Sequence, residues 1–196
     1  MIHLLLQAAH LGNSSAVRKN VIEFDLDVNA PRKRTKQAKQ FQKQEDNVQQ
    51  ETLLHTAASY CDETLVMFLV ERGKYFSYPS ILKHYGFIIG AKPSILNKQQ
   101  LSPFHTAILA GNTSVVRFIM ERRGKSFDGY HPSKAAPSGR TPLQLAIASG
   151  VTAMVEFFIK EATTHDVERC WNVEPMSNEI RDVLRTKVEK CFCLCF

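Results

Sequence analysis

The stretch Ser102-Pro103-Phe104-His105-Thr106-Ala107 returns, with similar residues at most positions, as Thr141-Pro142-Leu143-Gln144-Leu145-Ala146 in this 196-residue chain. Each copy is followed at the same offset by a glycine, Gly111 or Gly150, and then by two apolar pairs four residues apart. A third copy begins at Thr52, with Cys61 in the place of the glycine, and a weaker fourth opens the chain around Gly12. A pattern that recurs in this way predicts a stack of similar structural units.

Each copy has the residues of two short antiparallel helices. Ser or Thr at 52, 102 and 141 is a good N-cap, and Pro103 or Pro142 suits the first helical position, where no amide hydrogen bond is lost. Glycine ends the first helix because it adopts a positive φ at little cost, which Cys61 does not. The apolar pairs form one stripe on the second helix. We therefore expect helix pairs that bury these stripes against their neighbours.

The pattern resembles the ankyrin repeat, whose signature is close to T-P-L-H-x-A followed by a helix that ends in glycine. Asp27-Val28-Asn29-Ala30 is similar to the usual end of a repeat in that family. The resemblance covers residues 1–30, 51–73, 101–124 and 140–161, and it implies an all-α solenoid of about four helix pairs. The residues to which it assigns structural roles are Thr52, His55, Ser102, Pro103, His105, Gly111, Thr141, Pro142 and Gly150.

The spacing of the copies departs from the family period of about 33 residues. Equivalent positions 3, 52, 102 and 141 are 49, 50 and 39 residues apart. The extra residues fall at 31–50, 74–100 and 125–139, which we expect to be enlarged loops between helix pairs. The middle insert is apolar enough to pack or to form an extra helix. We expect an ankyrin-repeat domain at 1–165 and a capping helix with a cysteine-rich tail at 166–196.

The histidines of the repeated pattern, His55 and His105, are candidates for catalysis, but the resemblance implies a structural role. In ankyrin repeats this histidine bonds to neighbouring turns and to the capping Ser or Thr. Gln144 occupies the same place in another copy, and glutamine cannot carry out acid–base chemistry. Cys61 has no base beside it, and no phosphate-binding loop, zinc motif or nucleophile elbow is present. We expect no catalytic residue, no metal and no cofactor.

Positive charge is concentrated in one segment. Residues 31–50 hold six basic and two acidic side chains, a net +4 out of the +6 of the whole chain. The basic residues are Arg32, Lys33, Arg34, Lys36, Lys39 and Lys43. A nuclear import receptor, an anionic lipid or a nucleic acid could meet this segment, or it could be a loop kept soluble by its charge. Nucleic acid is the least favoured of these partners, because no base-reading motif accompanies the segment.

The C-terminal residues suggest a cap and a lipid site. Ser177 can cap a last helix, on which Ile180 and Leu184, with Val183 and Val188, mark one apolar face. The last four residues, Cys193-Leu194-Cys195-Phe196, resemble a prenylation box, and the final Phe favours a geranylgeranyl group on Cys193. Cys195 is an unusual third residue for such a box. One lipid chain holds a protein only marginally, so a second signal is needed, either a palmitoyl group on Cys191 or the charge of the basic cluster at 32–43. The alternative is an unmodified apolar tail.

The expected function is that of a scaffold or adaptor that binds another protein through the concave face and the loops, and not that of an enzyme. No stretch approaches the ~18 apolar residues of a membrane span, and the first residues do not resemble a signal peptide. Five cysteines form a poor disulfide framework. We expect a cytoplasmic protein, on the cytosolic face of a membrane if Cys193 is prenylated. Loop-expanded ankyrin chains of this kind resemble effectors of intracellular bacteria. The alternative is a soluble nuclear or cytosolic regulator without lipid, for which 32–36 is the import signal.

Overall fold

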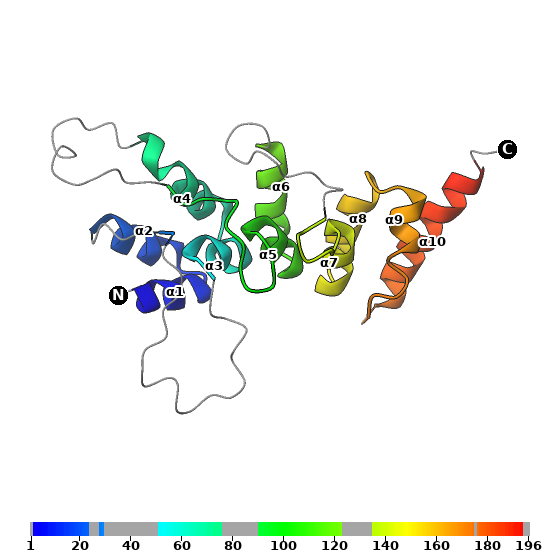
Figure 1. The fold of residues 1–196 in the computed structure, drawn as a ribbon, viewed down its shortest axis with the longest axis horizontal. Helices are drawn as coiled ribbons and strands as arrows, with labels where there is room; N and C mark the ends of the chain where they lie inside the picture. Colours follow the sequence, from blue (N-terminus) through cyan, green and yellow to red (C-terminus); the bar gives the residue numbers. More distant parts are fainter. Residues whose placement is uncertain are drawn as a thin grey trace, which may run out of the picture.

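A computed structural model describes residues 2–23, 28–29, 51–75, 90–122, 135–174 and 176–193. Over these residues the chain forms ten α-helices and no strand (Figure 1). The first helices of the repeats are α1 (Ile2–His10), α3 (Leu53–Tyr60), α5 (Pro103–Leu109) and α7 (Pro142–Ser149). The second helices are α2 (Ser14–Glu23), α4 (Glu63–Tyr75), α6 (Thr113–Glu121) and α8 (Thr152–Ile159). Two further helices, α9 (Thr164–Glu168) and α10 (Asn178–Cys193), follow them.

The helix pairs stack side by side along one axis (Figure 1). The first helices form one row, in which α3 packs between α1 and α5, and α7 packs on α5. The second helices form another row, in which α4 packs between α2 and α6. This arrangement confirms the predicted all-α solenoid. Each pair hides its apolar stripe against its neighbours, because a single pair has no core of its own.

Small and apolar residues at equivalent positions make the close packing possible. The alanines of the first helices at 57, 107 and 146 are fully buried, and so are Val115 and Val116 of the second-helix stripe. An alanine lets two helix backbones approach, and a valine loses little rotamer freedom on burial. The predicted stripe positions therefore lie in the core.

Glycine ends three of the four first helices with a left-handed residue. Gly12, Gly111 and Gly150 have φ of 69°, 74° and 71°. The remaining first helix, α3, ends at Cys61, which does not adopt this conformation, because its φ is −107°. The chain leaves α3 through an extended residue there, and the Cys61 Sγ donates a hydrogen bond to the carbonyl oxygen of Ala9, 3.2 Å away. The cysteine is thus tolerated in the glycine position without backbone strain.

The glycines differ in what a side chain would meet, which gives a matched prediction. We expect Gly111→Ala to lower the free energy of unfolding by about 2 kcal/mol and Gly150→Ala by about 1 kcal/mol. A Cβ at Gly111 would lie 2.7 Å from the Val151 Cγ2, whereas one at Gly150 meets nothing within 4 Å. Urea unfolding measures both losses. Adding Val151→Ala to Gly111→Ala should bring the two losses closer together, and equal losses in the single variants would contradict the steric argument.

Two tight turns precede α5 and α7, and we call them the fingers: residues 97–101 and residues 136–140. In the first, the amide of Asn97 donates to the carbonyl of Leu101 at 2.9 Å; in the second, the amide of Ala136 donates to the carbonyl of Arg140 at 2.8 Å. The fourth residue has a positive φ in each finger, 57° at Gln100 and 83° at Gly139. The first finger therefore places a glutamine in a conformation that favours glycine.

Gln100→Gly is expected to stabilise the protein by about 1 kcal/mol, because a residue with a Cβ is strained in the left-handed region. The gain is limited by the larger backbone entropy of glycine in the unfolded chain. Gly139→Ala is the opposite change at the equivalent position, where nothing lies within 4 Å of the added Cβ, and it should cost about 1 kcal/mol. Thermal unfolding of both variants checks the prediction, and a lower midpoint for Gln100→Gly would refute it.

The C-terminal helices close the stack with one helix more than the sequence indicated. Helix α10 packs on α8 and α9. Its predicted apolar residues Ile180 and Leu184 are fully buried in the core, each with 0% of its surface exposed to solvent. Helix α9, which the sequence analysis did not predict, begins at the N-cap Thr163. The domain boundary that we placed after residue 165 falls inside α9, and α10 continues to Cys193, within the expected tail.

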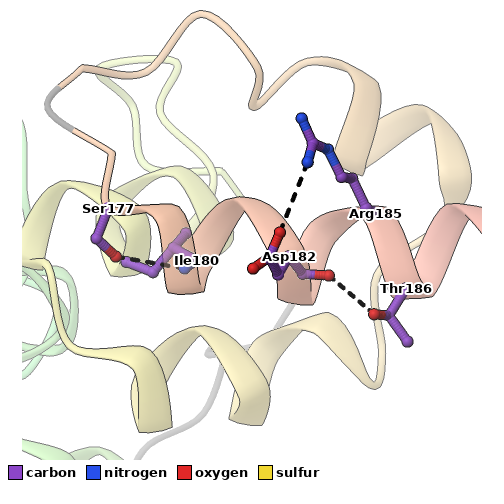
Figure 2. Close-up of polar contacts among 5 residues, drawn as sticks. All are labelled: Ser177, Ile180, Asp182, Arg185 and Thr186. Carbon is purple, nitrogen blue, oxygen red and sulfur yellow. Dashed lines mark hydrogen bonds and ion pairs between the residues drawn. The ribbon is translucent and has the colours of Figure 1, made fainter.

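The solvent side of α10 is polar, as Figure 2 shows. At the start of the helix the hydroxyl oxygen of Ser177 accepts a hydrogen bond from the amide of Ile180, 3.3 Å away. One turn later Asp182 and Arg185 form an exposed ion pair at 3.6 Å, and Thr186 donates to the carbonyl of Asp182 at 2.8 Å. Exposed pairs of this kind add little stability, but a polar outer face keeps the end of a repeat stack soluble.

Candidate protein-binding face

The capping residue of each repeat and the residue three positions later form a recurring hydrogen-bonded unit. The His55 Nδ1 accepts from the amide of Thr52 at 3.3 Å and lies 2.9 Å from the Thr52 hydroxyl. The other ring nitrogen, Nε2, lies 3.1 Å from the carbonyl oxygen of Leu101 in the next repeat. A neutral ring with its proton on Nε2 satisfies all of these contacts. His55 therefore closes its own helix and ties it to the following finger.

Burial lowers the pKa of His55 to about 4, although its hydrogen bonds to the backbone of Leu101 and Ile95 favour the charged form. The ring has no solvent exposure at all. At neutral pH it is thus uncharged, with both nitrogens engaged by the backbone and by Thr52. These contacts leave it no free nitrogen for acid–base chemistry on a ligand.

The same unit recurs with different residues. In α5 the Nδ1 of His105 lies 2.8 Å from the Ser102 hydroxyl. In α7 the side chain of Gln144 accepts from the amide of Thr141 at 3.0 Å and donates to the carbonyl of Arg169 at 3.1 Å. In α9 an aspartate replaces it, and the chemistry of the cap is unchanged. The structure thus places the predicted capping residues at helix starts and does not bring the two histidines into one site.

Asparagine side chains supply a second set of links between neighbouring repeats. Asn29 donates to the carbonyl of Gly90 at 3.2 Å and accepts from the amide of Lys92 at 2.8 Å. Asn112, at the start of α6, donates to the carbonyls of Ala58 and Cys61 at 3.0 and 2.8 Å. These bonds give the carbonyl groups at the end of α3 a hydrogen-bond donor. The repeats are therefore held together by polar bonds as well as by apolar packing.

The described residues offer little to a catalytic or metal site. They contain no group of three or more His, Cys, Asp or Glu side chains that could hold a metal ion. Cys61 and Cys170 are buried, and burial raises the pKa of both thiols, that of Cys170 to about 11. A thiol is a poor nucleophile until it is ionised. No helix in this part of the chain is long and apolar enough to span a bilayer.

In each helix pair, the two residues directly before the turn position (12, 61, 111 or 150) are at least partly accessible to solvent. We call these eight residues the first-helix face: His10, Leu11, Ser59, Tyr60, Leu109, Ala110, Ala148 and Ser149. Leu11 is 77% exposed and Tyr60 is 49% exposed, so both large side chains are accessible on this face. The rings of His10 and Tyr60 lie in contact, with their centroids 4.1 Å apart and their planes tilted by 49°. These residues were not predicted from the sequence, although each pair stands directly before the turn position of its repeat.

Several predicted site residues lie outside the part of the chain that the structure describes. These are the basic residues Arg32, Lys33, Arg34, Lys36, Lys39 and Lys43 and the end of the tail after Cys193. Helix α10 includes Cys191 and Cys193 in its backbone. Lipidation at either cysteine stays a prediction.

The family description "Ankyrin repeats (3 copies)" matches residues 75–169 of the chain. Together with the stacked helix pairs and the capped first helices, this match supports the assignment of the chain to an ankyrin-repeat family. Ankyrin repeats are in general modules for protein–protein interaction, and the family is typically non-enzymatic. No curated protein matches the chain.

Proposed function

We propose that this protein is a scaffold that binds another protein through its first-helix face and its fingers, and that it catalyses no reaction. The observation that carries the proposal is the exposure of Leu11 and Tyr60, at 77% and 49%, on the row where the repeats present the ends of their first helices. Tyrosine side chains are over-represented among the residues that dominate protein–protein binding energy. The elongated stack offers these residues to a partner along one continuous surface.

A pulldown from cell lysate with mass-spectrometric identification tests this proposal. Ala110 is exposed at the end of α5, so Ala110→Arg should leave the fold intact while it places a bulky charge in the centre of the face. We expect partners to be lost with Ala110→Arg and with Tyr60→Ala, and retained with Arg117→Ala on the solvent side of α6. Circular dichroism checks the folding of each variant. The same partners on all variants would place binding elsewhere, and a deletion of residues 31–50 tests that insert separately.

The proposed location is the cytosolic face of a membrane, with a geranylgeranyl group on Cys193 and a second lipid on Cys191. The motif at 193–196 supports it, as does the direction of α10, whose last turn points away from the stacked repeats (Figure 1). The alternative is a soluble regulator that enters the nucleus through the basic segment at 32–36. Each location depends on a different segment, so the two can be separated.

Fractionation of cells that express the wild type, Cys193→Ser, or a variant with glutamine at 32, 33, 34 and 36 distinguishes the two locations. Anchoring predicts that only Cys193→Ser leaves the membrane fraction and that the C-terminal peptide gains the mass of the lipid. Nuclear import predicts that only the glutamine variant changes its distribution. An unchanged distribution of Cys193→Ser, with an unmodified peptide mass, would remove the lipid proposal.

A further inference from the structure

The first-helix face contains no lysine, arginine, aspartate or glutamate. Of its eight residues only His10 and Tyr60 are ionisable, and the rest are aliphatic side chains or serines. Its N-terminal half, on α1 and α3, presents the bulky side chains of Leu11 and Tyr60, whereas its C-terminal half, on α5 and α7, is small at Ala110, Ala148 and Ser149. A charged side chain of a partner that packed against this C-terminal half would have to lose its hydration on binding. The face is therefore suited to an apolar surface that approaches closely at its C-terminal half.

The two fingers, which precede α5 and α7, carry positive charge. Lys98 lies in the first finger and Arg140 in the second, and both are exposed. The described segments that contain the fingers, 90–101 and 135–140, hold a third basic residue, Lys92, and no aspartate or glutamate. The C-terminal half of the face thus lies on helices whose preceding turns are basic, since each finger leads directly into α5 or α7.

We propose that the partner contributes a single segment that is apolar where it meets Leu11 and Tyr60 and acidic where it meets Lys98 and Arg140. This inference rests on the proposed function and adds the chemistry of the partner to it. Burial of the apolar side supplies most of the affinity, at roughly 25 cal/mol per Å² of apolar area. The basic residues speed association and reject basic partners, because complementary charges at the edge of an interface act mainly on encounter and on specificity.

Selection of displayed random peptides on the purified full chain tests the proposal. A length of about 20 residues suits the selection, because three steps between neighbouring first helices span roughly 30 Å. Peptides that also bind the Ala110→Arg variant are removed, so those that remain depend on the first-helix face. We expect the enriched sequences to combine aromatic or aliphatic residues with Asp and Glu, and to be depleted in Lys and Arg. A polyglutamate peptide of equal length is the probe for charge alone and should not bind.

The affinity of one enriched peptide is then measured on charge-reversed variants. Lys98→Glu with Arg140→Glu should weaken binding by at least about tenfold at low salt, and the effect should shrink in high salt. Lys19→Glu with Arg117→Glu makes the same change in net charge on exposed residues of the second helices, and it should leave the affinity within about twofold.

The outcomes separate this inference from the proposed function. Enriched peptides that are basic, or whose affinity the reversal at 98 and 140 does not reduce, overturn the acidic half of the proposal while protein binding stands. Tight binding of polyglutamate overturns the apolar half. If no peptide depends on the first-helix face, both the inference and the proposed function fail.

Discussion

Between about pH 6.5 and about pH 4, the free energy of unfolding of the wild type is expected to fall by about 3 kcal/mol more than that of the His55→Gln variant. The pKa of His55 is lowered from 6.5 to about 4 in the folded state, chiefly by burial. Between these two values the unfolded chain binds a proton that the folded chain does not. The free energy of unfolding therefore falls as the pH falls through this window, and the contribution of His55 is complete above it.

Glutamine is the right replacement because the protein already uses it in the same place. Gln144 accepts from the amide of Thr141 at 3.0 Å and donates to Arg169 at 3.1 Å, as His55 does with Thr52 and Leu101. His55→Gln should thus keep the neutral-pH stability within about 1 kcal/mol. It has no proton to gain at mildly acidic pH.

Urea unfolding of both proteins at about pH 7 and about pH 4.5 checks this, and the difference between their pH profiles isolates His55. Carboxylates also titrate at acidic pH. At Asp62 burial raises the pKa, but hydrogen bonds from Leu65 and Thr64 help to lower it overall. At Asp166 the hydrogen bond from the Thr163 side chain is the main cause of a lowered pKa. Both proteins share these groups, so they cancel in the comparison. Parallel pH profiles for wild type and variant would show that His55 does not resist protonation in the folded state.

Asn112→Ala is expected to lower the free energy of unfolding by about 3 kcal/mol, because this residue serves two repeats at once. Its side-chain oxygen caps α6 by accepting from the amide of Val115 at 3.4 Å. Its Nδ2 also satisfies the carbonyls of Ala58 and Cys61 at the end of α3. Alanine removes the cap and leaves part-buried carbonyls without this donor.

Asn13 provides the matched control, because it caps α2 with its side-chain oxygen in the same way, 3.0 Å from the amide of Ala16. Asn13→Ala should cost about 1 kcal/mol, the usual effect of losing an N-cap. Asn112→Asp keeps an oxygen for the cap but replaces the donor with a carboxylate, so we expect it to lose about 2 kcal/mol. Denaturant midpoints at constant slope measure all three losses. If Asn112→Ala and Asn13→Ala cost the same, the links to α3 contribute nothing.

The repeated helix pairs could be predicted from the sequence because their signals are local. The capping residue, the proline beside it and the apolar stripe each fix one step of the backbone within a few residues, and they agree with one another. The positions 102–107 and 141–146 carry all of these signals, and the helices α5 and α7 begin where they place them. The buried valines at 115 and 116 follow from the same periodicity.

The rest depends on contacts between repeats, which the sequence does not display. Helix α9 has a capping pair, Thr163 and Asp166, but it is only five residues long and lacks an apolar stripe. The extended backbone of Cys61 reflects a contact with Ala9 from the preceding repeat. The exposure of Leu11 and Tyr60 is likewise a result of stacking, because an isolated helix does not reveal which of its apolar residues stays uncovered. The candidate binding face therefore emerged from the structure.

The polar links of His55, Asn29 and Asn112 join each repeat to its immediate neighbours and to no distant part of the described chain. A tensile load applied along the stack would be borne by one junction after another. We expect the molecule under force to peel pair by pair from an end, with a separate extension step for each junction, and not to rupture in one event.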